Sequence, residues 1–214
     1  MTREFIYLKE MGLTPLWVKR NVSQDAPMQE ESSWPILEKN IKNCTACARS
    51  TQRCGAMVGN GSRQAKWVFI TDSPTQKEDK EGKVLVGEAG ELFDKMLAAM
   101  GLERADIFIL PVVRCAATVF PTTEEIYACQ PYLLEQMSLL NPGMMVVMGE
   151  FALMAMCMLL EKEGGIANLR GQVHYHQECP WVVTYAPAYL LENTAAKKMV
   201  WDDLRLAMRT LAGA

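Results

Sequence analysis

Four cysteines are spaced so that they could share one metal centre. Cys44 and Cys47 form a CxxC pair, and Cys115 and Cys129 follow much later in the chain. Two thiolates separated by two residues reach the same side of one turn, so the pair can chelate a single metal centre. A zinc ribbon would show a second CxxC pair, which Cys115 and Cys129 do not form. On spacing alone, four unrelated buried thiols remain an open alternative.

The composition is typical of one globular domain, and its net charge does not favour binding to the phosphates of DNA. The 214 residues are half hydrophobic and carry a formal net charge of −3, which suits a single core. Because proteins that grip DNA phosphates usually carry a cationic surface, strong direct DNA binding is not expected. We expect a cytoplasmic protein, since the first ten residues lack the pattern of a signal peptide and no apolar run is long enough to span a bilayer.

The elements that would position the cysteines alternate between strands and helices. Strands are predicted at 67–72, 107–113, 144–148 and 181–185, and helices at 88–100, from 151 onward and at 194–211. A capping box, with Thr122 as N-cap and Glu125 at N3, predicts a further helix that continues to about Leu140. Continuous apolar strands alternating with helices predict a mainly parallel central sheet covered on both sides. Ligands bind at the carboxyl ends of such strands, so chemistry is expected in the loops after Asp72, Val113 and Tyr185.

The N-terminal segment is predicted to stand apart from this domain. Within residues 1–20, Phe5, Leu8 and Met11 recur at helical spacing before Gly12. Residues 21–33 are polar and rich in helix breakers, which is typical of a linker. The expected organisation is therefore an N-terminal peptide at 1–20, a linker at 21–33 and a domain at 34–214.

The domain resembles the family-4 uracil-DNA glycosylases. The matching segments are 78–92, 112–115, 124–133, 169–171 and 187–191, in the family's order. The resemblance implies a three-layer α/β/α uracil-DNA-glycosylase-like fold. It also implies a [4Fe–4S] cluster held by Cys44, Cys47, Cys115 and Cys129, which would act as a staple between distant segments and take no part in the chemistry.

The same resemblance implies that the residues which handle uracil are replaced. Asp72 keeps a carboxylate in a loop that has lost the family's two glycines, and Leu85 replaces a phenylalanine that stacks on the base. Pro111 replaces an asparagine that reads the uracil edge. Ala186 and Glu192 replace a histidine donor and an arginine. Because losing one oxyanion-type donor costs about 10²–10³ in rate, we expect a catalytically inactive relative with a degenerate former active site.

Residues 5–20 resemble the N-terminal peptide of the psi subunit of bacterial DNA polymerase III, which has a short helix and a tryptophan followed by basic residues. The resemblance implies a non-catalytic subunit of the clamp-loader complex in the replisome of the bacterial nucleoid. It would bridge the tau/gamma subunits to the chi subunit and hence to single-stranded-DNA-binding protein. The residues expected to bind the partner are Phe5, Leu8, Met11, Leu16, Trp17 and Arg20.

Two alternatives from other functional classes stay open. The chain could be an enzyme of the uracil-DNA glycosylase family, or a reader of damaged bases, with altered specificity. It could also sense iron or redox state through the cluster, although no sequence feature argues for that role.

Overall fold

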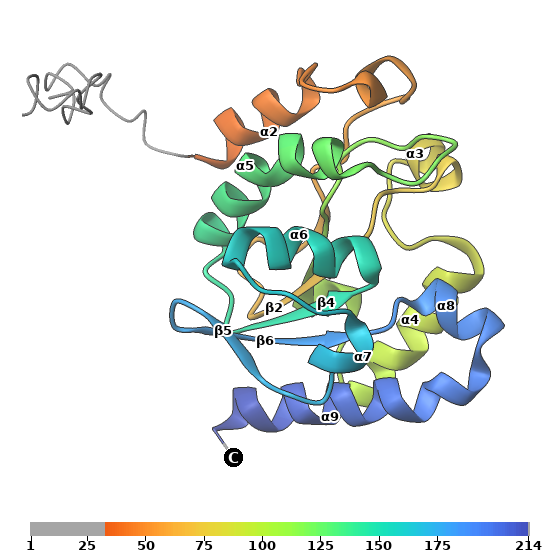
Figure 1. The fold of residues 1–214 in the computed structure, drawn as a ribbon, viewed down its shortest axis with the longest axis vertical. Coiled ribbons are helices and arrows are strands. Elements are labelled where there is room, and N and C mark those ends of the chain that lie inside the picture. The colour runs from red at the N-terminus through yellow and green to blue at the C-terminus, as the bar shows by residue number, and fades with distance from the viewer. Residues whose placement is uncertain (1–32, 214) are drawn as a thin grey trace, which may run out of the picture. The chain divides into compact units, whose positions relative to one another are not determined.

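A six-stranded sheet forms the centre of the protein in the computed structural model, which describes residues 33–213 (Figure 1). The strands lie in the order β1-β3-β2-β4-β6-β5. Their bounds are β1 Asn60–Gly61, β2 Trp67–Thr71, β3 Ile107–Pro111, β4 Met144–Met148, β5 His174–His176 and β6 Cys179–Thr184. The four central strands run parallel, and the short edge strands β1 and β5 pair antiparallel. The predicted parallel sheet is therefore confirmed.

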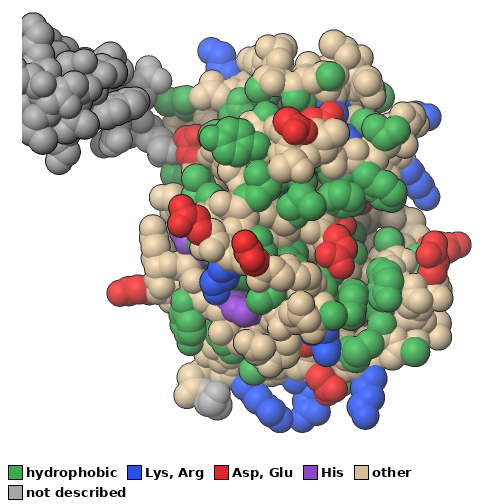
Figure 2. Space-filling view, in the orientation of Figure 1, with side chains coloured by type: hydrophobic (Ala, Val, Ile, Leu, Met, Phe, Trp, Pro, Cys, Tyr) green, Lys and Arg blue, Asp and Glu red, His purple; other side chains and the backbone are tan. Residues whose placement is uncertain are grey.

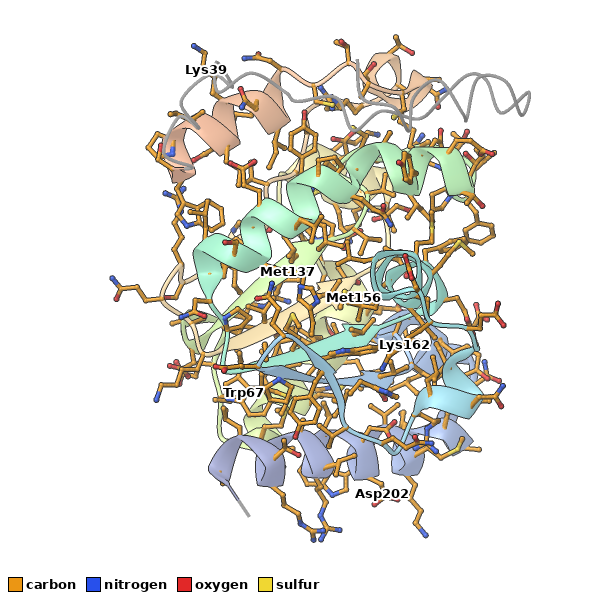
Figure 3. All side chains as sticks on the ribbon, turned by 60° about the vertical axis from the view of Figure 1, so that its left-hand side comes forward. Lys39, Trp67, Met137, Met156, Lys162 and Asp202 are labelled. Carbon is orange, nitrogen blue, oxygen red and sulfur yellow. The ribbon has the colours of Figure 1, made fainter. Side chains whose placement is uncertain are left out.

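Helices cover both faces of the sheet, which gives three layers (Figures 1 and 3). Lys39 on one helix and Asp202 on another mark the two outer layers in Figure 3. The α-helices are α2 Trp34–Lys42, α3 Gln76–Glu81, α4 Gly87–Met100, α5 Thr123–Leu140, α6 Glu150–Leu160, α7 Ile166–Leu169, α8 Pro187–Glu192 and α9 Lys197–Ala212. Short 3-10 helices lie at η1 Ala48–Thr51, η2 Arg104–Asp106 and η3 Thr194–Ala196.

Alternation along the strands builds a separate core on each face of the sheet. In β2, Val68 and Ile70 face the core beneath α5 and α6, where Met137 and Met156 are also buried. Phe69 faces the other core, against α4 and α9. Successive side chains of a strand point to opposite faces, so a five-residue apolar strand feeds both cores.

The capping box predicted at the start of α5 is present. The Thr122 hydroxyl accepts the Glu125 N–H, and the Glu125 carboxylate accepts the Thr122 N–H at 2.9 Å. The short helices α2, α3 and α8 were not predicted from the sequence. The strand predicted at 107–113 ends at Pro111, because the chain turns there into the loop that carries Cys115.

The surface in Figure 2 carries hydrophobic side chains around α6, while Lys and Arg side chains gather over α9 at the lower edge. In the part of the chain that the structure describes, no helix combines the length and apolar character needed to cross a bilayer. The predicted N-terminal peptide at 1–20 and its six partner-binding residues lie outside the described residues, as does the linker at 21–33 except for Ser33.

Candidate active site and cysteine cluster

A cavity of about 580 Å³ lies at the carboxyl ends of the parallel strands. It is lined by residues that follow β2 and β3, by the first turn of α6 and by the start of α8. The lining side chains that concern the chemistry are Asp72, Leu85, Phe120, Phe151 and Ala186. The volume falls in the range of small-molecule sites and has room for one nucleobase. The three loops that the sequence analysis singled out thus meet around one cavity.

Asp72 supplies a carboxylate in the wall of the cavity. Its Oδ1 accepts the backbone N–H of Ala152 at 2.7 Å, so it caps the start of α6, where Gly149 has no side chain to do so. Gly149 has a φ of +108°, and a Cβ there would overlap the Asp72 carboxylate. Burial raises the pKa of Asp72 to about 6, against the lowering effect of the Ala152 and Phe151 amides. A carboxyl that titrates near neutral pH can exchange protons with a substrate or a water molecule.

Leu85 also lines the cavity, and its backbone is held by hydrogen bonds on both sides. It has a φ of +55°, a conformation that leucine rarely adopts. Its N–H donates to Glu78, and its carbonyl accepts Nη2 of Arg104 at 2.6 Å. Gly90 leaves room for this turn, since a Cβ there would overlap the Leu85 carbonyl. The apolar Leu85 side chain is therefore fixed where it can contact a ligand but offers it no hydrogen bond.

The five positions of the predicted former active site do not all meet. Asp72, Leu85 and Ala186 line the cavity. Pro111 is buried at the end of β3 and Glu192 is exposed at the end of α8, and neither lines it. Sequence reasoning missed Phe120 and Phe151, whose rings stack with centroids 5.4 Å apart beside the cavity. No motif marked them, because their meeting depends on the tertiary fold.

The four predicted ligand cysteines gather near one another. Cys115 and Cys129 are buried, while Cys44 and Cys47 are partly exposed. Burial raises the pKa of the Cys115 thiol, and Cys129 and Cys47 raise it further by charge repulsion, while Arg53 lowers it. Burial is also the main cause of the raised pKa of Cys129, to which Cys47 and Cys44 add. Within residues 33–213, no three His, Cys, Asp or Glu side chains are arranged to hold a metal ion.

Donor groups surround these thiols. Nη1 of Arg53 donates to Sγ of Cys115 at 2.7 Å, and the Tyr132 hydroxyl hydrogen-bonds Cys44.

Arg114 is fully buried and donates from Nη1 to the Pro111 carbonyl. Its Nε and Nη2 have no partner among the described residues. Burial lowers the pKa of Arg114 to about 10, so it stays cationic at neutral pH. A buried cation with two free donors indicates that an anionic acceptor belongs beside it.

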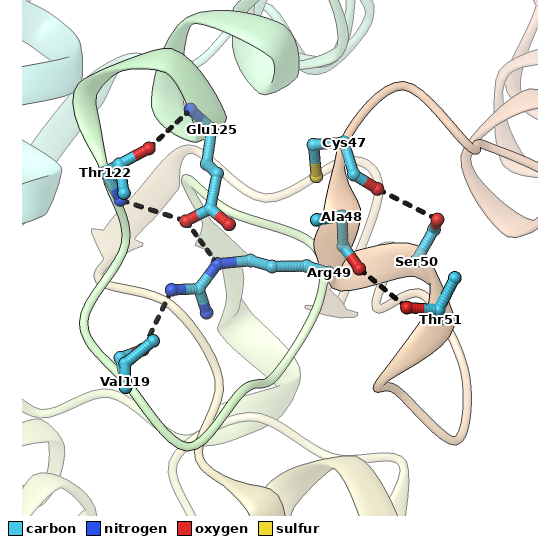
Figure 4. Close-up of polar contacts among 8 residues, drawn as sticks. All are labelled: Cys47, Ala48, Arg49, Ser50, Thr51, Val119, Thr122 and Glu125. Atoms are coloured by element: carbon cyan, nitrogen blue, oxygen red, sulfur yellow. Dashed lines mark hydrogen bonds and ion pairs between the residues drawn. The ribbon is translucent and has the colours of Figure 1, made fainter.

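Arg49 connects the cysteine region to the cavity (Figure 4). It follows Cys47 by two residues and is buried in η1. Its Nε donates to Oε2 of Glu125 at 2.7 Å, and its Nη2 donates to the Val119 carbonyl at 2.8 Å. Val119 belongs to the loop that lines the cavity. The segment after the CxxC pair thus fixes both the start of α5 and one wall of the cavity.

Several known proteins that are similar to most of this chain are named as glycosylases. A type-4 uracil-DNA glycosylase from Thermotoga maritima is 32% identical over 83% of this chain and 94% of that protein. One from Archaeoglobus fulgidus is 31% identical over 79% of this chain and 88% of that protein. One from Pyrobaculum aerophilum is 29% identical over 79% and 90%, respectively.

These comparisons overturn the expectations about activity, role and partners. The predicted absence of enzymatic activity is wrong, because the relatives that match most of the chain are named as enzymes. The predicted role as a psi-like clamp-loader subunit is also wrong, as are its chi and tau/gamma partners and the expected lack of strong DNA binding, because those relatives are named for action on DNA.

The family follows from the domain itself. The model of the uracil DNA glycosylase superfamily matches residues 58–205. This range contains the parallel strands, Asp72 and the whole lining of the cavity. The chain belongs to the uracil DNA glycosylase superfamily.

Proposed function

We propose that this chain acts on DNA as a glycosylase that accepts a damaged base, with a base specificity broader than that of a uracil enzyme. The observation that carries the proposal is the cavity at the carboxyl ends of the strands, with the Asp72 carboxyl in its wall and the pKa of that carboxyl raised to about 6. A glycosylase must take its target base out of the duplex into such a pocket. The relatives' names support the reaction class.

The lining supports altered specificity. Leu85 and Ala186 stand in the cavity where the family resemblance implies a stacking ring and a histidine donor, and neither forms a side-chain hydrogen bond. Pro111 does not line the cavity, and it offers no amide to read a base edge. Polar pockets discriminate by the hydrogen bonds that a wrong substrate leaves unpaired. With those groups replaced, shape and contact with Phe120 and Phe151 become the main means of selection.

Asp72 is the residue that we assign to the chemistry. In hydrolysis, a water oxygen forms a bond to C1′ of the sugar, the N-glycosidic bond breaks, and its electron pair leaves with the base. The ionised Asp72 carboxylate can orient the water and accept its proton. The N–H of Ala152 holds Oδ1 in place, so the direction of the carboxylate is fixed before substrate arrives.

The test is base release from synthetic duplexes that each contain one uracil or one hypoxanthine, scored by alkaline cleavage of the resulting abasic strand. We expect the wild-type protein to release at least one of these bases and Asp72→Asn to lose the activity. Asp202→Asn is the matched control, because Asp202 is exposed on α9 away from the cavity. Absence of release from both duplexes would contradict the proposal.

We also propose that Cys44, Cys47, Cys115 and Cys129 hold a [4Fe–4S] cluster. Cys thiolates are the usual ligands of such clusters, and the free Nε and Nη2 of Arg114 fit a negatively charged group with sulfur acceptors. When bound, the cluster would supply a structural link between the CxxC segment, the loop after β3 and α5. A cluster of several irons spaces its ligands more widely than one ion does, so the lack of a single-ion site in the described residues does not conflict with it. Iron and sulfide analysis of anaerobically purified protein tests the proposal, and colourless protein that contains zinc would refute it.

A further inference from the structure

Two arginines lie against the cysteine thiols with no carboxylate to neutralise them. Arg114 is fully buried and Arg53 is half-buried. Within residues 33–213, neither forms an ion pair with an acidic side chain, whereas the other fully buried arginine, Arg49, is paired with Glu125. Because burying an unpaired cation is costly, the charges of Arg53 and Arg114 indicate that a negatively charged group belongs beside the thiols.

Arg53 joins the CxxC segment to Cys115. Its Nη1 donates to Sγ of Cys115 at 2.7 Å, and its Nη2 donates to the carbonyls of Cys44 at 2.7 Å and Lys42 at 3.1 Å. Hydrogen bonds from a charged donor are shorter and stronger than those between neutral groups. Arg53 therefore places a positive charge directly against one sulfur and fixes the segment that carries another.

Arg114 approaches the same thiols from the protein interior. Its backbone N–H donates to the thiol of Cys129, and the charge of its side chain acts on both Cys129 and Cys115. Nη1 is used by the Pro111 carbonyl, while Nε and Nη2 have no partner among the described residues. These two donors are free to bind a group that the thiols hold.

The charges of the two arginines match those of a cluster held by four thiolates. In its common oxidised state the core of a [4Fe–4S] cluster carries two positive charges, and four thiolates bring the total to two negative charges. Arg53 and Arg114 together supply two positive charges. One-electron reduction adds one negative charge and transfers no proton. Nearby cations stabilise that reduced state, and they do so more strongly in the protein interior than in water.

We propose that Arg53 and Arg114 are the counter-ions of the cluster and raise its reduction potential. The assignment rests on the proposed [4Fe–4S] cluster and adds the residues that set its potential. Both side chains act through charge and hydrogen bonds, and neither ligates iron. Arg114 should have the larger effect, because water and salt screen a fully buried charge less than a half-buried one.

The experiment measures the midpoint potential of the cluster in the full-length protein after anaerobic purification. Electrochemical titration is followed by the electron paramagnetic resonance signal of the reduced state. Arg53→Gln and Arg114→Met each remove one positive charge, so reduction should become less favourable. We expect a shift of about tenfold or more in the equilibrium between the two states, which lowers the midpoint potential by about 59 mV or more. The potential does not depend on how many chains hold a cluster, so a variant with less iron can still be measured.

Two further variants separate the charge of Arg53 from other effects. Arg53→Lys keeps the positive charge and should shift the potential far less than Arg53→Gln. Lys42→Gln is the matched control for loss of a charge close to the CxxC pair, because Lys42 is exposed and already paired with Glu38, and it should leave the potential almost unchanged.

Equal midpoint potentials in the wild-type protein, Arg53→Gln and Arg114→Met would overturn the assignment. A shift in Lys42→Gln or Arg53→Lys as large as that in Arg53→Gln would overturn it as well. If Arg114→Met holds no cluster, the comparison of Arg53→Gln with Arg53→Lys decides. Wild-type protein without iron and sulfide would refute the cluster together with this assignment, whereas base release from damaged duplexes tests the glycosylase activity separately.

Discussion

The Asp72 carboxylate accepts the backbone N–H of Ala152 at 2.7 Å, although the two residues lie 80 positions apart. This contact joins the end of β2 to the first turn of α6 and closes one side of the cavity. One side chain therefore stabilises a helix and also presents a carboxyl to the site. Both roles can be separated by experiment, because an asparagine keeps the hydrogen-bond acceptor and loses the charge.

The activity should depend on pH through Asp72. Burial raises the pKa of this group to about 6, so the ionised form that accepts a proton prevails only above that pH. We expect the rate of base release to rise between about pH 5 and 7 and then level off, with Asp72→Asn slow at every pH. Single-turnover rates over this range are the measurement. A wild-type rate that stays constant from pH 5 to 7 would exclude Asp72 as the base.

The contribution of Asp72 to the stability of the fold should fall as pH rises, whereas the rate of base release should increase. The pKa of Asp72 is higher in the folded protein than its ordinary value of 3.8. Between about pH 4 and 6 the folded state therefore binds more protons than the unfolded state, and this group's contribution to stability falls as pH rises. Asp72→Asn should remove that contribution, so the variant should gain stability relative to the wild-type protein as pH rises from 4 to 7. Urea denaturation at several pH values measures this difference.

Any side chain at position 149 should destabilise the protein. Gly149→Ala puts a Cβ against the Asp72 carboxylate and places alanine at a φ of +108°. We expect a loss of about 2–4 kcal/mol in the free energy of unfolding, from overpacking and backbone strain together. Gly101→Ala is the control, because Gly101 has a φ of +75° but no atoms near a built Cβ, and it should lose only about 1 kcal/mol. Equal losses in the two variants would show that the contact with Asp72 is unimportant.

Arg49 should contribute strongly to stability. It is buried and paired with Glu125, so Arg49→Met leaves the Glu125 carboxylate with the Thr122 N–H but without its charged partner, and we expect a loss of about 2–4 kcal/mol. Lys42→Met breaks an exposed pair with Glu38 and should cost at most about 0.5 kcal/mol. Chemical denaturation compares the two variants. A loss below 1 kcal/mol in Arg49→Met would refute the structural role of the pair.

Arg114 should matter for metal content more than for folding. Its Nε and Nη2 lack partners among the described residues, so Arg114→Met removes buried donors that nothing else in that part of the chain satisfies. We expect the metal-free variant to be at least as stable as the metal-free wild-type protein. The purified variant should nevertheless contain less iron per chain. The control is Lys39→Met, at an exposed position on α2, and equal iron content in both variants would contradict the account.

Much of the fold could be predicted because its signals are local. The strand at Met144–Met148 matches the prediction at both ends, since five consecutive apolar residues between polar turns leave little ambiguity. The start of α5 followed from the Thr122 and Glu125 capping box. The short helices α3 and α8 were missed because six residues carry too little periodicity to be recognised.

The site was harder to predict, because its members meet through the tertiary fold. Asp72 could be found from its place at a strand end, but its hydrogen bond to Ala152 could not. The hydrogen bonds of Arg49 to Glu125 and to the Val119 carbonyl could not be predicted either, because those residues are 70 or more positions away in the sequence. The replacements at Leu85 and Ala186 predict loss of activity, whereas the cavity that they line is still present and the Asp72 carboxylate remains in its wall.

The most direct test of the central claim is mass-spectrometric detection of a free base after incubation of a damaged duplex with excess protein at pH 7.5. We predict that the wild-type protein releases uracil or hypoxanthine and leaves an abasic strand, that Asp202→Asn does the same, and that Asp72→Asn releases at least 100-fold less, as expected when a general base is lost. Intact duplexes with no free base after incubation with the wild-type protein would contradict the assignment of a glycosylase activity to this chain.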